Sequence, residues 1–213
     1  MKLLSINVSK PKPVSYNGKT IHTGIFKAPV KGRVVLKRLN LHGDGQGDLT
    51  VHGGVDKAVY AYPNEHYEHW RRELRRDNLT YGQFGENFTV EGMLEDGVHI
   101  GDVFRIGSAL VEVSQPRVPC FKLGLKMGNP TFPKLFLASE RSGFYLRVLE
   151  PGEVDAGDAI ERVKVGQKCL TVKAVHHLLY FDSGNLDGIH EVLGNPALAA
   201  SWRESFEKVL ADA

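Results

Sequence analysis

Cys120 is the residue of this chain best suited to metal or nucleophilic chemistry. Pro116 and Pro119 stiffen the backbone before it, and Arg117 and Lys122 flank it with positive charge. Cationic neighbours favour the thiolate, which is the form that binds soft metals and attacks electrophiles. The sequence therefore predicts a metal ligand or a nucleophile at Cys120. A small, buried, apolar side chain is the alternative interpretation.

A second concentration of polar residues lies at residues 41–57. Five glycines, three aspartates, two histidines and one lysine fall within these seventeen residues. Glycine lets the backbone approach a ligand closely, and the polar side chains offer donors and acceptors. Gly53 and Gly54 ahead of Lys57 could cradle an anion, although their spacing matches neither glycine-rich phosphate motif. We expect a ligand-binding segment, with an ordinary turn region as the alternative.

His66 and His69 are the remaining candidates for metal binding. They are three positions apart, so they share one face of a predicted helix. The pattern His-x-Glu-His matches neither form of the catalytic zinc helix. Surface or half-buried histidines are therefore the preferred interpretation.

Short strands must position these groups in the first two-thirds of the chain. Strands bounded by turn residues are predicted at 3–8, 14–16, 19–23, 33–39, 58–62, 87–90, 102–106, 110–114, 143–149 and 159–163. The pair Asn17-Gly18 predicts a two-residue hairpin turn. Helices are predicted at 64–76 and 130–137. Regularly spaced short strands favour a barrel or a sandwich.

The pattern changes after Val163. From Lys164 onward, apolar residues recur at helical spacing, and breaks at 182–185 and 194–196 divide this part into three short helices. Pro196 suits the first turn of the last helix. We therefore predict two domains, at residues 1–163 and 164–213.

Composition limits the classes of protein to which the chain could belong. The 213 residues are 42% hydrophobic and 24% charged, and their net charge is only +2. That surplus is too small to predict a nucleic-acid or membrane surface. No stretch approaches the roughly 20 apolar residues of a membrane-spanning helix. The two cysteines, Cys120 and Cys169, lie in different contexts, which favours a reducing, cytoplasmic location over a disulfide framework.

Four motifs follow one another along residues 1–163. They are His52-Gly53-Gly54-Val55-Asp56-Lys57-Ala58-Val59-Tyr60-Ala61-Tyr62-Pro63, Phe84-Gly85-Glu86-Asn87-Phe88, Ile100-Gly101-Asp102 and Pro116-Arg117-Val118-Pro119-Cys120. Together they resemble the signature of MOSC-domain proteins, which bind molybdenum cofactor. The C-terminal part, with Pro196, Trp202 and Phe206, is similar to the three-helix domain of the YiiM-like, 6-N-hydroxylaminopurine-resistance branch.

The resemblance implies an α+β, mainly β fold, with a MOSC-type β-barrel, embedded helices and a small C-terminal three-helix domain. It also implies molybdenum cofactor (molybdopterin) with the Cys120 thiolate on the metal, which makes Cys120 both catalytic residue and metal ligand. The cofactor pocket would be lined by His52, Gly53, Gly54, Lys57, Asn87 and Arg117. Of these, Lys57 and Arg117 would meet the cofactor phosphate.

The activity implied by the resemblance is reduction of N-hydroxylated bases such as 6-N-hydroxylaminopurine to the amino form, which detoxifies them. The chain has no flavin or nicotinamide motif, so a separate electron-donating reductase, expected to be a flavoprotein, is implied. We expect no nucleic-acid or membrane partner, and a homodimer is one possible assembly. The alternative function is a molybdenum cofactor or sulfur carrier without reductase activity of its own.

Overall fold

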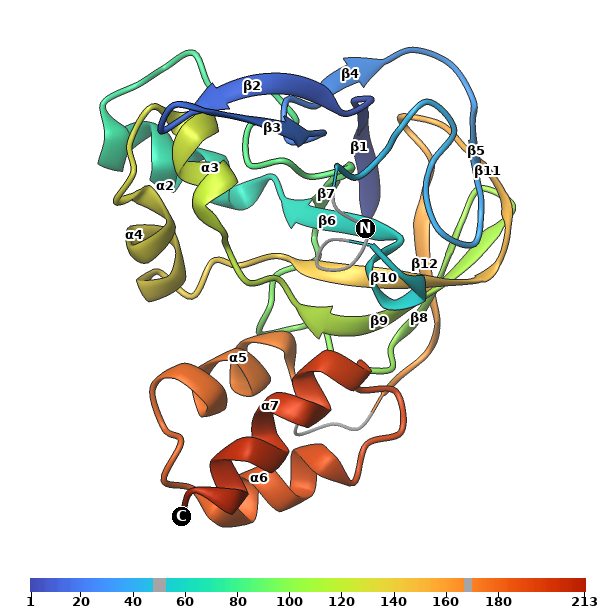
Figure 1. Cartoon of the computed structure of the whole chain (residues 1–213). Helices are drawn as coiled ribbons and strands as arrows, with labels where there is room; N and C mark the ends of the chain where they lie inside the picture. The colour runs from blue at the N-terminus through green and yellow to red at the C-terminus, as the bar shows by residue number, and fades with distance from the viewer. Residues whose placement is uncertain (48–52, 167–169) are drawn as a thin grey trace.

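The computed structural model describes residues 1–47, 53–166 and 170–213 (Figure 1). Its N-terminal half contains β1 (Lys2–Val8), β2 (Lys12–Tyr16), β3 (Lys19–Thr23), β4 (Ala28–Val30), β5 (Val34–Leu36), the 3-10 turn η1 (Val55–Lys57), β6 (Val59–Pro63), α2 (Glu65–Leu74), β7 (Phe88–Glu91) and β8 (Val103–Ile106). There follow β9 (Ala109–Pro116), α3 (Phe121–Met127), α4 (Phe132–Ala138), β10 (Phe144–Glu150), β11 (Gly152–Val154), β12 (Ile160–Lys164), α5 (Val172–Tyr180), α6 (Leu186–Leu193) and α7 (Ala200–Ala211). The fold is α+β and mainly β, as predicted.

The main sheet has eight strands in the order β12-β8-β9-β10-β6-β7-β1-β4. All neighbours are antiparallel except β6 and β7. The start of β12 approaches β1, because the Leu3 amide donates to the Asp158 carbonyl at 3.0 Å. The only strand-type pairing there is the single bridge Lys2–Ala159, so no ladder joins these strands among the described residues. The sheet is thus not closed, and the predicted barrel is not supported.

The predicted hairpin at residues 14–23 is confirmed. Asn17 and Gly18 have φ values of 50° and 73°, as a two-residue turn with two left-handed positions requires. The turn sets a register that places Lys12 opposite Thr23. The other predicted strands are present, although the one predicted at 33–39 is reduced to β5. Sequence patterns missed β4 and β11, which have three residues each.

Aromatic side chains form a separate core beneath α2, α3 and α4. Helix α2 buries Tyr67 and Trp70 against Phe84 and Phe136, and the rings of Trp70 and Phe136 stack with centroids 5.5 Å apart. The aromatic residues here therefore pack internally. It holds α3 and α4 beside the sheet, and α3 begins directly after Cys120.

The three predicted C-terminal helices are present as α5, α6 and α7, which lie together below β9 in Figure 1. Thr171 and Asn185 cap α5 and α6 by accepting hydrogen bonds from backbone amides at 3.0 Å. Apolar side chains such as Trp202 and Phe206 share one hydrophobic core with the sheet. The division into domains at Val163 and Lys164 stays a prediction. None of the helices in the described part of the chain is long and apolar enough to cross a membrane.

Candidate functional site

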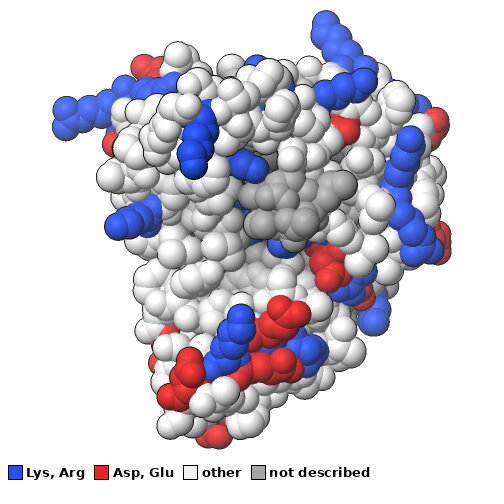
Figure 2. Space-filling model, in the orientation of Figure 1, with Lys and Arg blue, Asp and Glu red and all other residues white. Residues whose placement is uncertain are grey.

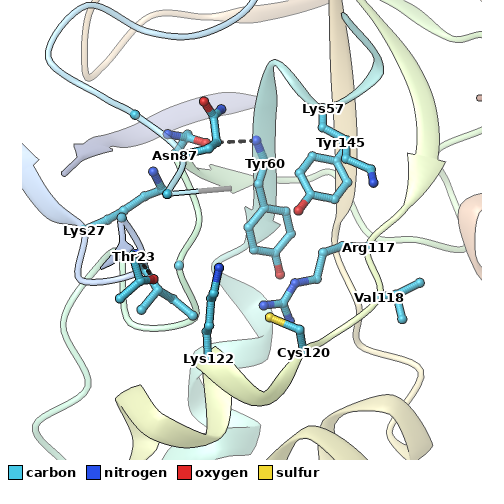
Figure 3. Close-up of a pocket in the computed structure, with 16 residues that line it drawn as sticks. Thr23, Lys27, Lys57, Tyr60, Asn87, Arg117, Val118, Cys120, Lys122 and Tyr145 are labelled. Atoms are coloured by element: carbon cyan, nitrogen blue, oxygen red, sulfur yellow. Dashed lines mark hydrogen bonds between the residues drawn. The ribbon is translucent and has the colours of Figure 1, made fainter. Parts of the chain in front are cut away.

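A pocket of about 90 Å³ lies where the end of β3, the segment 45–47, strand β6 and the start of α3 converge. Four of the predicted site residues line it, namely Lys57, Asn87, Arg117 and Cys120 (Figure 3). The other residues that line it are Thr23, Gly24, Ile25, Lys27, Gly45, Gln46, Gly47, Tyr60, Gly85, Val118, Lys122 and Tyr145. Residues from six separate segments of the chain therefore meet around one space.

Cys120 occupies the N-cap position of α3, with extended backbone angles of φ −122° and ψ 173°. Its carbonyl accepts a hydrogen bond from the Leu123 amide at 2.9 Å, so the backbone turns into the helix at this residue. The side chain is partly exposed. Figure 3 shows its Sγ atom beside the guanidinium group of Arg117.

The Arg117 side chain is buried, with only 5% of the residue exposed. Its Nη2 donates to the Phe84 carbonyl at 3.4 Å, whereas Nη1 has no hydrogen-bond partner among the described residues. The guanidinium carbon lies 5.0 Å from the Tyr60 ring centroid and 5.1 Å from that of Phe136. Burial opposes the charge and is the largest single effect, but Tyr60, Tyr145, Cys120 and Tyr62 together outweigh it, so the pKa of Arg117 is raised. A permanent buried cation with a vacant donor calls for an acceptor that the described residues do not supply.

Three lysines add positive charge to the same pocket. Lys122 is 9% exposed and points into the space in Figure 3, and its amine has no hydrogen-bond partner in the described part of the chain. Burial lowers the pKa of Lys57, an effect that Asp56 partly opposes. Lys27 is different, because its amine is paired with the Asp44 carboxylate at 2.5 Å. The pocket is thus built to receive an anion.

Asn87 supports the pocket through its side-chain amide. Its Oδ1 accepts from the Tyr60 amide at 3.1 Å, and its Nδ2 donates to Asp44 at 2.9 Å and to the Asn7 carbonyl at 3.3 Å (Figure 3). Both ends of the amide are therefore used within the chain. Asn87 joins β6, β1 and the segment at Asp44, and so it positions the pocket wall.

Glu86 is a buried carboxylate within the Phe84-Gly85-Glu86-Asn87 motif, and it holds a loop of the site in place. Its oxygens accept from the Gly82 amide at 2.7 Å, the Phe84 amide at 3.0 Å and the Tyr67 hydroxyl. Burial raises the pKa of Glu86, and these donors oppose that effect. The bonds hold the loop whose Phe84 carbonyl accepts from Arg117, so Glu86 fixes one contact of the site.

The glycines of residues 41–57 also serve packing, and Gly45 and Gly47 line the pocket as well. A Cβ on Gly47 would collide with the His22 carbonyl, and one on Gly24 would collide with the Gly45 carbonyl. These glycines let the segment pack tightly on the end of the hairpin. Gly53 and Gly54 do not line the pocket, and His52 lies outside the described residues. The roles predicted for these three residues stay predictions.

His66 and His69 do not form a metal site with other described residues. The Nε2 atom of His66 lies 2.6 Å from a Glu95 oxygen, and the second Glu95 oxygen accepts from the Gly143 amide at 2.7 Å. Residue Gly143 also accepts from the Arg117 amide through its carbonyl. His66 is thus buried and held by Glu95, whereas His69 is partly exposed.

Sequence reasoning missed the contributions of the hairpin end and of α3. Nothing in the local pattern indicates that Lys27 and Thr23 lie beside Cys120, because the hairpin reaches the site only in the folded chain. Lys122 was noted solely as a nearby charge. A helix beginning at Phe121 would have placed it, but that helix was not predicted.

The chain is similar to known proteins over almost its entire length. The MOSC domain matches residues 48–161, and the YiiM-like 3-alpha helix domain matches residues 170–212. The uncharacterized protein YflK of Bacillus subtilis is 47% identical over 206 residues, which cover 97% of this chain and 93% of YflK. A protein of Gibberella moniliformis named reductase is 34% identical over 74% of this chain but only 28% of its own length.

A solved structure has the same architecture. The crystal structure of YiiM from Geobacillus stearothermophilus superposes with a TM-score of 0.84, 38% sequence identity and 98% coverage of both chains. The sequence motifs, the two domain matches and this structure agree with one another. The chain therefore belongs to the MOSC domain family, in the branch that carries a YiiM-like three-helix domain.

Proposed function

We propose that the protein is a molybdenum-cofactor-dependent reductase that converts N-hydroxylated bases such as 6-N-hydroxylaminopurine to their amino form. One observation carries the proposal: the Cys120 thiol and the buried, incompletely partnered Arg117 guanidinium face the same pocket. Membership of the MOSC domain family and the relative named reductase support it.

The residues present fit this cofactor. Thiolate is a soft ligand suited to molybdenum, and Cys120 is the pocket residue that can supply it. The vacant Nη1 of Arg117 and the amine of Lys122 are suited to the phosphate of the pterin, with Lys57 as a third cation. When bound, the molybdenum centre would supply the two-electron redox chemistry.

The chain itself would bind and orient the substrate and would supply protons. Cleavage of an N–O bond to an amine and water consumes two protons. Burial lowers the pKa of Lys57, so its ammonium gives up a proton more readily than an exposed lysine would. Burial also raises the pKa of Tyr145, which keeps its hydroxyl protonated as a hydrogen-bond donor at neutral pH. These two groups are the candidates to hold a proton beside the reacting oxygen.

The test compares molybdenum and pterin content in protein purified from a host that makes the cofactor. The variants are Cys120→Ala and, as a matched control, Cys169→Ala at the other cysteine. We expect metal in the parent and the control and a loss in Cys120→Ala. Absence of metal from all three despite cofactor supply would overturn the proposal.

Turnover is then measured with 6-N-hydroxylaminopurine and reduced methyl viologen, a small reductant that needs no protein partner. Formation of adenine by the parent and the Cys169→Ala control, but not by Cys120→Ala, supports a reductase. Protein that is loaded with cofactor and gives no turnover would instead be a carrier.

A further inference from the structure

The charge of this protein is divided unevenly along the chain. Residues 1–43 contain nine of the 27 Lys and Arg residues and none of the 25 Asp and Glu residues. The remaining residues therefore carry 18 basic and 25 acidic side chains, although the whole chain has a net charge of only +2. The basic surplus of the molecule is thus confined to β1 to β5 and their connections.

Eight of these nine basic side chains are exposed. Three of them, Lys10, Lys12 and Lys19, lie on the hairpin β2–β3 or directly before it, and we call this part of the surface the basic face. None of the eight forms an ion pair with any residue that the structure describes, whereas Lys27, the ninth, is paired with Asp44. Figure 2 shows Lys and Arg side chains spread over the upper part of the molecule, where β2 to β5 lie in Figure 1. Unpaired like charges repel one another, so the folded chain gains nothing from keeping them together.

The hairpin connects the basic face to the candidate site. Lys12 pairs directly opposite Thr23, which lines the pocket, and opposed residues of a strand pair share one face of the sheet. The Lys12 amine lies over the Phe26 ring, 4.7 Å from its centroid. The Tyr16 ring packs against Phe121, with centroids 4.8 Å apart, immediately after Cys120. The hairpin therefore borders the pocket at Thr23 and contacts Phe121, the residue after Cys120, at Tyr16, so Lys12 lies near the edge of the pocket.

We propose that the basic face docks an acidic flavoprotein, which delivers electrons to the pocket. The proposal rests on the reductase function proposed above. The substrate R–NH–OH takes up two electrons and two protons, its N–O bond breaks, and R–NH2 and water are released. A reduced flavin of the partner gives up the two electrons and is oxidised. Opposite charges would steer the two proteins together and orient the flavin toward the pocket.

A nucleic acid could also be attracted to a basic surface, but the observations favour a protein. Single-stranded nucleic acids bind where exposed aromatic rings stack the bases. On the basic face, the Tyr16 ring is already packed against Phe121, and the Phe26 ring is covered by the Lys12 amine. A cationic surface on which these two rings are already engaged suits an acidic protein, and the reductase function proposed above requires electrons.

The test uses the loaded protein and reduced flavodoxin, an acidic FMN protein, as the probe. One variant combines Lys10→Glu, Lys12→Glu and Lys19→Glu on the hairpin. The matched control combines Arg105→Glu, Lys173→Glu and Lys208→Glu, which are exposed basic residues outside residues 1–43. Both variants change the net charge by the same amount. Flavodoxin binding is measured by calorimetry at low and high salt, and turnover is measured with flavodoxin and with reduced methyl viologen.

We expect the hairpin variant to lose about tenfold or more in flavodoxin affinity and in flavodoxin-driven turnover at low salt. In the control variant, flavodoxin affinity and flavodoxin-driven turnover should change less than about twofold. Turnover with methyl viologen should be unchanged in both variants. Equal effects in the two variants, or no flavodoxin binding by the parent at low salt, would overturn the docking proposal. The docking proposal would also be overturned if the parent bound a 20-nucleotide single strand more tightly than flavodoxin and the hairpin variant abolished that binding. Failure of the parent with methyl viologen would instead contradict the reductase function.

Discussion

Arg147 binds a single carboxylate oxygen of Asp56 with two of its nitrogens, Nε at 2.8 Å and Nη2 at 2.6 Å. Asp56 belongs to η1 and precedes Lys57, which lines the pocket. The same guanidinium donates to Glu112 on β9 at 2.8 Å and to the Ala197 carbonyl at 3.3 Å. One side chain of β10 thus joins the pocket turn, the sheet and the C-terminal segment.

This relationship predicts that Asp56→Asn lowers cofactor retention. The substitution keeps the size of the side chain but removes the charge that holds η1 to β10. We expect the free energy of unfolding to fall by about 1.5 kcal/mol and the molybdenum content per chain to fall several-fold. Glu112→Gln is the matched control, because it removes a partner of Arg147 that does not carry Lys57. Equal loss of molybdenum in both variants would show that η1 is not positioned in this way.

Asn87→Asp is predicted to destabilise the fold strongly. The Asn87 amide nitrogen donates to the Asp44 carboxylate at 2.9 Å in a buried setting, so the new carboxylate would face an existing one. An uncompensated buried charge costs about 3–5 kcal/mol. Urea denaturation at pH 7 measures the loss. Gln46→Glu is a suitable control, since it adds a carboxylate at a nearby, partly exposed residue and should cost much less.

Arg117→Met is predicted to separate stability from function. Methionine can occupy the space beside the Tyr60 and Phe136 rings, and it removes a buried cation that lacks one hydrogen-bond partner. Replacing a buried charge by an apolar group of similar size is often neutral or stabilising. We therefore expect a melting temperature equal to or above that of the parent, measured without cofactor, together with a loss of molybdenum. A melting temperature lower by many degrees would mean that Arg117 serves mainly the fold.

Some residues of the site can be selected from the residue types of their immediate neighbours in the sequence. Cys120 and Arg117 share one proline-stiffened segment, and Lys57 follows a glycine pair, so local residue types were sufficient to select them. The structure brings these residues to one pocket, and their roles there stay predictions. Asn87 was selected by resemblance, and the structure shows why an amide is needed: its two ends bond to different neighbours, the Tyr60 amide and the Asp44 carboxylate.

The features that were missed depend on packing. Helix α3 has only seven residues and contains Gly124, which weakens a helical pattern. A Cβ on Gly124 would lie 2.9 Å from the Asn129 carbonyl oxygen, so the close packing of the α3–α4 turn requires glycine there. The barrel was wrong for a similar reason. Closure depends on whether β12 and β1 pair over several residues. The sequence pattern of a strand does not show with which other strand it pairs.

His176 gives the last prediction, which concerns stability and pH. The residue is completely buried in α5, and neither ring nitrogen has a hydrogen-bond partner among the described residues. Burial lowers the pKa of His176 to about 4, against the opposing effect of the Glu140 and Glu95 carboxylates and with a smaller contribution from His177. The imidazole is therefore neutral in the folded protein.

A histidine whose pKa is lower in the folded state destabilises the fold as the pH falls. Below the unfolded pKa of about 6.5, the unfolded chain takes up a proton that the folded chain refuses. Between pH 7.5 and 5 this linkage amounts to about 2 kcal/mol. The parent loses stability between these two pH values, and we expect His176→Leu to remove the part of that loss that comes from this linkage. Urea denaturation at both pH values measures it. His177→Gln is the control, because that neighbouring ring is exposed and pairs with Glu140 at 2.7 Å. If His176→Leu loses as much stability as the parent between pH 7.5 and 5, the buried ring must take up its proton within the folded protein.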